Sequence, residues 1–126
     1  MNQEYYSFSR AYHGVALFGC KLYIVGGFNG FTCLSTTLCL NLKTRRWSKK
    51  ARMFEPRCYV CTLAYRGYIY VFGGHSGGNR LKSCERYDPR RNKWIRVSDM
   101  MYRRSDASGA ELNGKMMHKN IHISNF

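Results

Sequence analysis

The stretch Leu22-Tyr23-Ile24-Val25-Gly26-Gly27 returns 47 residues later as Ile69-Tyr70-Val71-Phe72-Gly73-Gly74. Other residues share this interval: Trp47 and Trp94, Met53 and Met100, and the series Arg10, Arg57 and Arg104. A repeat of this length is typical of solenoids and propellers, in which each unit buries its apolar face only against its neighbours. The function of the chain therefore depends on how these units pack.

Each repeat contains four short segments with β-strand character, and no segment has a helical period. The segments are residues 12–18, 22–25, 36–42 and 47–52 in the first repeat, and 59–65, 69–72, 83–89 and 94–98 in the second. The four-residue runs before the paired glycines suit strands buried on both faces. Hairpin turns are expected at Cys20-Lys21 and Arg66-Gly67. The paired glycines themselves predict positive φ angles and close backbone packing.

Four strands in a unit of this length predict a propeller blade, and therefore an all-β fold. We expect a partial β-propeller of two four-stranded antiparallel blades plus part of a third. The predicted units are an N-terminal segment (1–9), blade 1 (10–56), blade 2 (57–103), the start of a third blade (104–117) and a divergent tail (118–126). The third repeat has Asn120 and Ile121 where the paired glycines belong. We expect a fragment or truncated product that is marginally stable alone, because two sheets bury little core.

Composition narrows the class of protein. Of the 126 residues, 44% are hydrophobic and 15% aromatic, which is unlike a disordered chain. No apolar run approaches the roughly 18 residues of a membrane span. Residues 1–9 lack the basic start and apolar core of a signal peptide. We therefore expect a cytoplasmic or nuclear protein that does not associate with membranes.

Positive charge is concentrated around the two tryptophans. The chain has 21 Lys and Arg against 7 Asp and Glu, and many of the basic residues fall in 43–52 and 90–96, at equivalent places in the two repeats. We interpret these clusters as solvated edge strands, where charge discourages edge-to-edge pairing. An acidic protein partner is a second interpretation. A nucleic-acid surface is the least favoured, because no recognised binding motif accompanies the charge.

Six cysteines are present, and only Cys58 and Cys61 have the spacing of metal ligands. A structural zinc site requires four ligands, and the histidines do not complete such a set. On a strand, residues three apart point to opposite faces. We predict reduced thiols that are buried or half-buried, with no bound metal and no cofactor.

At this point the residues resemble the kelch-repeat family. The runs before Gly26-Gly27 and Gly73-Gly74, followed by Glu85-Arg86-Tyr87-Asp88-Pro89, Trp94 and Met100, are similar to the kelch motif. Leu40-Asn41 replaces Tyr87-Asp88 in the first repeat, which makes that strand a weaker copy. Arg57-Cys58-Tyr59-Val60 and Arg104-Ser105-Asp106-Ala107-Ser108 resemble the kelch-like adaptors in particular.

The resemblance implies a protein-interaction module. In kelch-like proteins the propeller captures a protein substrate or peptide, while separate BTB and BACK domains dimerise and recruit a cullin-3 ubiquitin ligase. Those domains lie outside these 126 residues, so contact with cullin-3 is expected only through them. Several kelch proteins bind actin, and a cytoskeletal role is the alternative.

An enzyme is not expected, although some kelch propellers are copper oxidases. Such a site needs a tyrosine, a cysteine and paired histidines around one metal. The four histidines, His13, His75, His118 and His122, are scattered along the chain.

The resemblance also implies a partner-binding rim built from two groups of loops. The loops after the paired glycines supply Phe28, Asn29, His75, Ser76, Asn79 and Arg80, and the loops that enter each first strand supply Tyr12, Tyr59 and Asp106. Loops on a rigid scaffold are common binding surfaces. Two alternatives remain open: Tyr12 and Tyr59 pack inside, and Asn29-Gly30 and Gly77-Gly78 serve only as turns. The repeated Trp, Met and Tyr residues are expected to be structural: Trp47, Trp94, Met53, Met100, Tyr23 and Tyr70.

Overall fold

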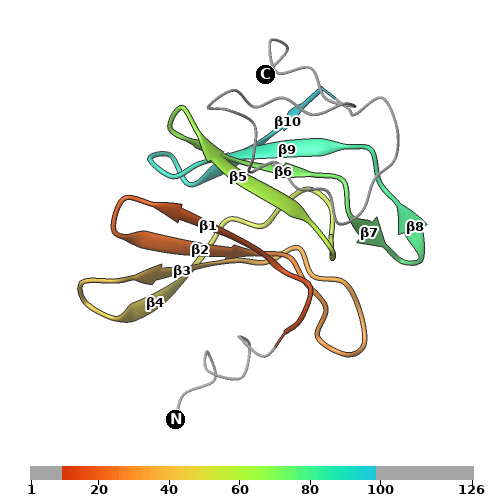
Figure 1. The fold of residues 1–126 in the computed structure, drawn as a ribbon, viewed down its shortest axis with the longest axis horizontal. Helices are drawn as coiled ribbons and strands as arrows, with labels where there is room; N and C mark the ends of the chain where they lie inside the picture. The colour runs from red at the N-terminus through yellow and green to blue at the C-terminus, as the bar shows by residue number, and fades with distance from the viewer. Residues whose placement is uncertain (1–9, 99–126) are drawn as a thin grey trace.

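The computed structural model describes residues 10–98, which form two four-stranded antiparallel sheets and a small two-stranded ribbon (Figure 1). The first sheet has the order β1-β2-β3-β4: β1 (Gly14–Phe18), β2 (Lys21–Val25), β3 (Thr37–Asn41) and β4 (Arg46–Lys50). The second has the order β10-β9-β6-β5: β5 (Cys61–Tyr65), β6 (Tyr68–Phe72), β9 (Cys84–Asp88) and β10 (Lys93–Val97). The ribbon pairs β7 (His75–Ser76) with β8 (Asn79–Arg80).

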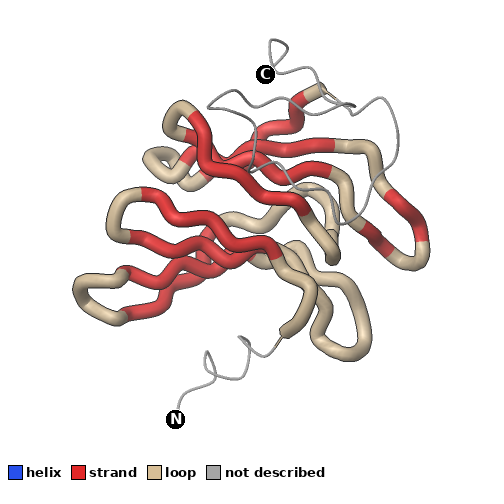
Figure 2. The backbone as a smooth tube through the Cα atoms, in the orientation of Figure 1, coloured by secondary structure: helices blue, strands red, loops and turns tan. Residues whose placement is uncertain are grey.

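All regular structure in this range is β-strand, which confirms the predicted fold class (Figure 2). The strand register also repeats with the sequence. Tyr23 faces Cys39 across the β2–β3 pair, and Tyr70 faces Arg86 at the equivalent place in the β6–β9 pair. A one-residue slip would exchange the two faces of a strand and move the side chains that pack between the sheets to the other side, so this packing fixes the register. The predicted third blade (104–117), the tail (118–126) and Met100 lie outside the described residues.

The tight turns follow from local chemistry. Gly19 (φ 62°) and Cys20 form the β1–β2 turn, whereas Lys21 begins β2, so the predicted turn at Cys20-Lys21 was wrong by one residue. A glycine at the first central position is what a type II′ hairpin turn requires. The β5–β6 turn is Arg66-Gly67, as predicted, with positive φ at both residues.

Asn41 and Asp88 start equivalent turns at the ends of β3 and β9. The Asn41 Oδ1 accepts a hydrogen bond from the Lys43 backbone N–H (2.9 Å), and the Asp88 Oδ1 accepts one from the Arg90 N–H (3.0 Å). Both side chains replace a backbone acceptor two residues before the donor. The strand predicted to be a weaker copy therefore has the same length and turn as its counterpart.

The main core lies between the two sheets. From the first repeat it takes Ala16, Tyr23, Val25, Cys39 and Met53, and from the second it takes Ile69, Val71, Tyr87 and Trp94. The Trp94 Nε1–H donates to the Ala51 carbonyl oxygen (2.9 Å) and to the Thr37 Oγ1 (3.2 Å). Burial raises the pKa of Tyr87 to about 12, and its hydroxyl donates to Asn92 (2.6 Å). Trp94 therefore joins the sheets by both packing and hydrogen bonds.

The two β-strands predicted to be buried on both faces differ. In β6, Ile69 and Val71 face the first sheet, and Tyr70 and Phe72 pack with Cys61 and Cys84 on the other face. That prediction is confirmed for β6 and wrong for β2. Leu22 and Ile24 are only half-buried, because they lie on the outer side of the first sheet, where Val15 (46%) and Leu17 (57%) are exposed.

Trp47 lies on this outer side and is half-buried, whereas Trp94, at the equivalent position, is buried between the sheets. Both tryptophans have the same place in their own sheets. The difference in their burial therefore comes from the neighbouring sheet: the first sheet packs against the side of the second sheet that carries Trp94. A packing role is therefore clear for Trp94, Met53, Tyr23 and Tyr70.

The basic clusters lie on edge strands and on the segments next to them, as predicted. β4 and β10 are the outermost strands of the two sheets, and most of their side chains are exposed. The turns that lead into them lie at the opposite end of the sheets from the β7–β8 ribbon (Figure 1). Among residues 10–98 there is no helix with the length and apolarity that crossing a membrane requires.

The cysteines largely follow the prediction. None of the six, all within residues 10–98, forms a disulfide; Cys39, Cys58, Cys61 and Cys84 are buried, and Cys33 is half-buried. Cys20 is exposed, contrary to the prediction, because it occupies the β1–β2 turn. Within residues 10–98, no group of three or more His, Cys, Asp or Glu side chains is placed to hold a metal ion.

Candidate functional site

Loops from both repeats meet at one end of the two sheets. The loop between β2 and β3 (26–36) and the loop that carries β7 and β8 (73–83) lie at this end, beside the segments that enter β1 and β5 (Figure 1). The two groups of loops that the sequence assigned to a rim are therefore neighbours in space.

Backbone hydrogen bonds hold these loops together. The Gly27 N–H donates to the Arg57 carbonyl oxygen (2.7 Å), and the Tyr59 N–H donates to the Tyr12 oxygen (2.8 Å). Cys58 and His75 exchange two hydrogen bonds, at 2.9 and 2.8 Å. The site is thus built on a scaffold that is fixed by main-chain contacts across the two repeats.

The paired glycines make this close approach possible, as predicted. Gly74 has a φ of 91°, and a Cβ atom there would lie 2.6 Å from the Cys58 carbonyl oxygen. Gly27 has a φ of 108°, and its Cβ would lie 2.9 Å from the Ala11 oxygen. Real Cβ atoms do not approach oxygen so closely, so glycine is required at both positions.

Two repeat-related arginines clamp the base of the loops. The Arg57 Nη1 donates to the carbonyl oxygens of Gly73 and Ser83, both at 2.8 Å. The Arg10 Nη1 donates in the same way to the Gly26 oxygen (2.8 Å) and to the Thr36 Oγ1 (2.9 Å). Burial lowers the pKa of Arg10. The sequence revealed these arginines as repeated residues but gave no sign of this role.

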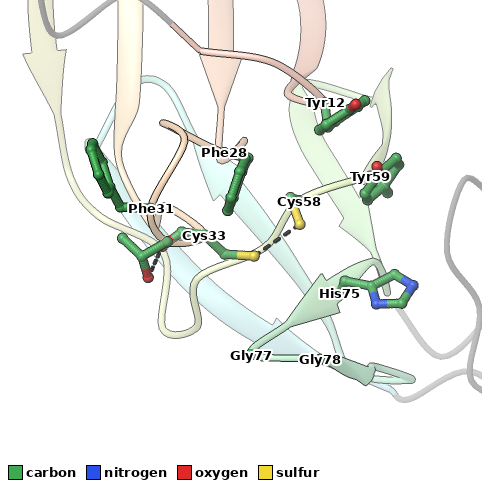
Figure 3. A pocket seen from close by; sticks show the side chains of 10 residues that line it. Tyr12, Phe28, Phe31, Cys33, Cys58, Tyr59, His75, Gly77 and Gly78 are labelled. Carbon is green, nitrogen blue, oxygen red and sulfur yellow. Dashed lines mark hydrogen bonds between the residues drawn. The ribbon is translucent and has the colours of Figure 1, made fainter.

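A cavity of about 300 Å³ opens between the loops (Figure 3). Its lining is mainly aromatic, with two thiols and one imidazole: Tyr12, Phe28, Phe31, Thr32, Cys33, Cys58, Tyr59, His75, Gly77 and Gly78. Mostly apolar walls with a few polar groups are typical of ligand pockets. Four of the predicted rim residues (Tyr12, Phe28, Tyr59 and His75) contribute to this lining.

Tyr12 and Tyr59 form a stacked pair at the mouth of the cavity. Their ring centroids are 4.1 Å apart, and the Tyr59 ring meets His75 edge-on at 5.7 Å. Tyr12 is 51% exposed and Tyr59 is half-buried, so the alternative in which both pack inside was wrong. Both residues have positive φ angles, of 58° and 57°, which are unusual for bulky side chains and recur at functional sites.

Of the other predicted rim residues, those that the structure describes do not line the cavity: Asn29, Ser76, Asn79 and Arg80. The Asn29 Oδ1 accepts hydrogen bonds from the Phe31 and Thr32 N–H groups, both at 2.9 Å, so Asn29 has the turn role of the alternative interpretation. Ser76, Asn79 and Arg80 belong to the β7–β8 ribbon, whose turn is Gly77-Gly78. Asp106 lies outside the described residues.

The prediction missed six lining residues: Phe31, Thr32, Cys33, Cys58, Gly77 and Gly78. Phe31 could have been predicted from the sequence, because it follows the Asn29-Gly30 turn. The turn places it at the tip of a loop, where it is 92% exposed. An exposed aromatic side chain on a loop is a good interface anchor. Cys33 and Cys58 are 25 residues apart in the sequence, and no sequence motif predicted that they would be close in space.

Comparison with known proteins identifies the repeat. The Kelch motif matches residues 9–54 and 56–101. Kelch repeat-containing protein kel-10 of Caenorhabditis elegans is 36% identical over 121 residues, which cover 92% of this chain and 21% of that protein. A Kelch repeat and BTB domain-containing protein of the same organism is 34% identical with the same coverage, and human Kelch-like protein 23 is 29% identical over 75% of this chain and 17% of its own length.

The chain thus spans about a fifth of the length of the first two relatives. The matched ranges coincide with the two sheets, each built from one repeat. The chain therefore belongs to the kelch-repeat family of protein-interaction modules, and its two sheets are two blades of a kelch β-propeller.

Proposed function

We propose that the cavity and its tyrosine stack capture a peptide segment of a partner protein, as part of the substrate-recognition propeller of a cullin-3 ubiquitin ligase adaptor. The observation that carries the proposal is the convergence of Tyr12, Phe28, Tyr59 and His75, from four separate segments, on one cavity. Aromatic side chains on rigid loops contribute large contact areas at low entropic cost.

The lining defines the chemistry of the ligand. A cavity of about 300 Å³ with aromatic walls suits one bulky apolar side chain of an extended peptide. Arg80, which is exposed on the neighbouring β7–β8 ribbon, is placed to attract an acidic residue beside it. The expected ligand is therefore a peptide with an apolar anchor and an adjacent carboxylate.

A random peptide library displayed on phage tests this proposal. Peptides enriched on the full chain should bind at least about tenfold more weakly to Tyr12→Ala and Tyr59→Ala, which corresponds to about 1.4 kcal/mol each. Phe54→Ala is the matched control, since Phe54 is 55% exposed and does not line the cavity. Equal binding to all three variants, each shown to be folded by circular dichroism, would place the binding site elsewhere.

The adaptor part of the proposal is supported by the relative named for a BTB domain in addition to its kelch repeats. Recruitment of cullin-3 is expected to pass through BTB and BACK domains and not through kelch repeats. The purified 126-residue chain should therefore not bind purified cullin-3. Direct binding of the two would contradict this division of labour.

An actin-binding role is the second candidate, favoured by the basic edge strands. Lys49 and Arg96 are exposed on β4 and β10, where they could meet an acidic filament surface. Co-sedimentation with actin filaments that persists at about 0.15 M salt would support a docked interface. Binding that disappears at this ionic strength is nonspecific charge attraction, and this result would exclude a specific actin-binding role. A cytoplasmic location is part of both proposals, and it is supported by six cysteines that form no disulfide among residues 10–98.

A further inference from the structure

Two thiols from different blades meet in the lining of the cavity. The Sγ atoms of Cys33, in the loop between β2 and β3, and of Cys58, just before β5, are 2.8 Å apart (Figure 3). Both residues line the cavity. Cys33 is half-buried and Cys58 is buried, so Cys33 is the more exposed of the two residues.

Main-chain contacts hold each thiol in place. Cys33 forms a β-bridge with Phe28, and the next residue, Leu34, donates its N–H to the Gly27 oxygen (2.8 Å) and accepts from the Arg57 N–H (2.9 Å). Cys58 follows Arg57 directly and is paired with His75 by two hydrogen bonds. Groups preorganised in this way react as if at very high local concentration.

The remaining cysteines lie in other surroundings. Cys39 belongs to the core between the blades, and Cys61 and Cys84 belong to the small cluster on the other face of β6. Cys20 is exposed in the β1–β2 turn, at the opposite end of the sheet. None of these four lines the cavity.

We propose that Cys33 and Cys58 are a redox-active dithiol that a hydroperoxide oxidises to an intramolecular disulfide. The sulfur of Cys33, the more exposed residue, attacks the peroxide; the O–O bond breaks, an alcohol or water leaves, and Cys33 becomes a sulfenic acid. The Cys58 sulfur then attacks the Cys33 sulfur, the S–S bond forms, and water leaves. In total the two thiols lose two electrons and two protons, and the hydroperoxide is reduced.

The modification would change the site in two ways. A covalent bond would join the β2–β3 loop of the first blade to the entrance of β5 in the second. It would also remove both S–H groups from the lining of the cavity. The inference stands on the geometry of the thiols and does not depend on which peptide the cavity binds.

The test uses the full chain with Cys20→Ser, which removes the exposed thiol that would cross-link two molecules. The protein is reduced, freed of reductant and treated with hydrogen peroxide. The expected result is the loss of two titratable thiols and of the mass of two hydrogen atoms, both reversed by dithiothreitol. Mass spectrometry of an unreduced tryptic digest should show peptide 22–43 joined to peptide 58–66, with fragmentation placing the bond between Cys33 and Cys58.

Each tryptic peptide contains a second cysteine, Cys39 or Cys61, so the fragmentation spectra decide the assignment. Cys33→Ser and Cys58→Ser should each abolish the cross-link, whereas Cys84→Ala should retain it. A bond between other cysteines, oxidation to sulfinic acid without a disulfide, or no loss of thiols would overturn the proposal. If Cys33→Ser or Cys58→Ser prevents folding, the position of the disulfide found by mass spectrometry in the Cys20→Ser protein decides the test by itself.

Discussion

Arg57 and Glu85 form an ion pair with no exposed surface on either side chain, and their Nη2 and Oε2 atoms are 3.1 Å apart. The first repeat has Arg10 in place of Arg57 but Leu38 in place of Glu85. Both arginines clamp the carbonyl oxygen of the first paired glycine, so clamping is common to both repeats. The buried ion pair belongs to the second repeat, where the Glu85 carboxylate also accepts from the Phe54 and Glu55 N–H groups.

Arg57→Ala should destabilise the protein by about 3–5 kcal/mol, because it leaves the Glu85 carboxylate buried without its counter-charge. Arg10→Ala is the matched control and should lower the free energy of unfolding by about 1–3 kcal/mol. It removes hydrogen bonds but leaves no buried carboxylate without a counter-charge. Urea denaturation followed by tryptophan fluorescence measures both. Equal losses would show that the ion pair adds nothing to the clamp.

Trp94→Phe should cost about 1–3 kcal/mol, because the Ala51 oxygen and the Thr37 Oγ1 lose the indole donor at the joint between the blades. Trp47→Phe, at the equivalent place on the outer side, should cost less than about 1 kcal/mol. The midpoints of urea denaturation, followed by far-ultraviolet circular dichroism, compare the two. A larger loss for Trp47→Phe would contradict the assignment of Trp94 as the residue that joins the blades.

Alanine substitutions at Gly78 and Gly74 distinguish the cost of a left-handed backbone conformation from the cost of a steric clash. Gly78 (φ 86°) has open space where a Cβ would lie, so Gly78→Ala should cost only about 1–2 kcal/mol of left-handed strain. Gly74→Ala meets similar strain together with the Cys58 oxygen, and should exceed about 3 kcal/mol or prevent folding. Thermal denaturation distinguishes the variants. Similar melting temperatures for the two variants would mean that the backbone around Gly74 can move away from the Cys58 oxygen at little cost.

His13 should make stability depend on pH. Burial, and then the positive charge of Arg10, lower the pKa of His13 below its usual value of about 6.5. The unfolded state therefore binds a proton more readily, and stability should fall as the pH drops from about 7.5 through the unfolded pKa towards the folded one.

His13→Asn should remove this part of the pH dependence, because asparagine does not titrate. The free energy of unfolding of both proteins, measured at intervals between about pH 8 and pH 5, gives the difference. Other titrating groups cancel in that comparison. Parallel curves for the two proteins would show that His13 has the same pKa in the folded and unfolded states.

The repeat made the fold predictable from the sequence. An interval of 47 residues located both sheets, and the continuous apolar run Ile69–Phe72 indicated that β6 is buried on both faces. The roles of Gly27 and Gly74 followed from the chemistry of glycine. Burial at Leu22 and Trp47 could not be derived in this way, because it depends on what packs against the outer side of the first blade and not on the strand itself.

The candidate site was predictable only in part. Family position correctly brought Tyr12, Phe28, Tyr59 and His75 to one end of the sheets, although whether they bind a partner stays a prediction. The proximity of Cys33 and Cys58 depends on the path of an irregular loop, which short-range patterns do not encode. Loop conformation is set by side-chain hydrogen bonds such as those of Asn29, whose tertiary consequences a linear pattern does not reveal.

The loops 26–36 and 73–83 have equal lengths and span equivalent strands, yet one folds around an asparagine turn and the other forms a β-ribbon. The ends of both are held by the same glycine and arginine contacts. In evolutionary terms, mutations between these fixed ends are free to remodel the proposed binding surface while the blades keep their register. New specificities can therefore arise in one loop at a time, without selection having to rebuild the fold.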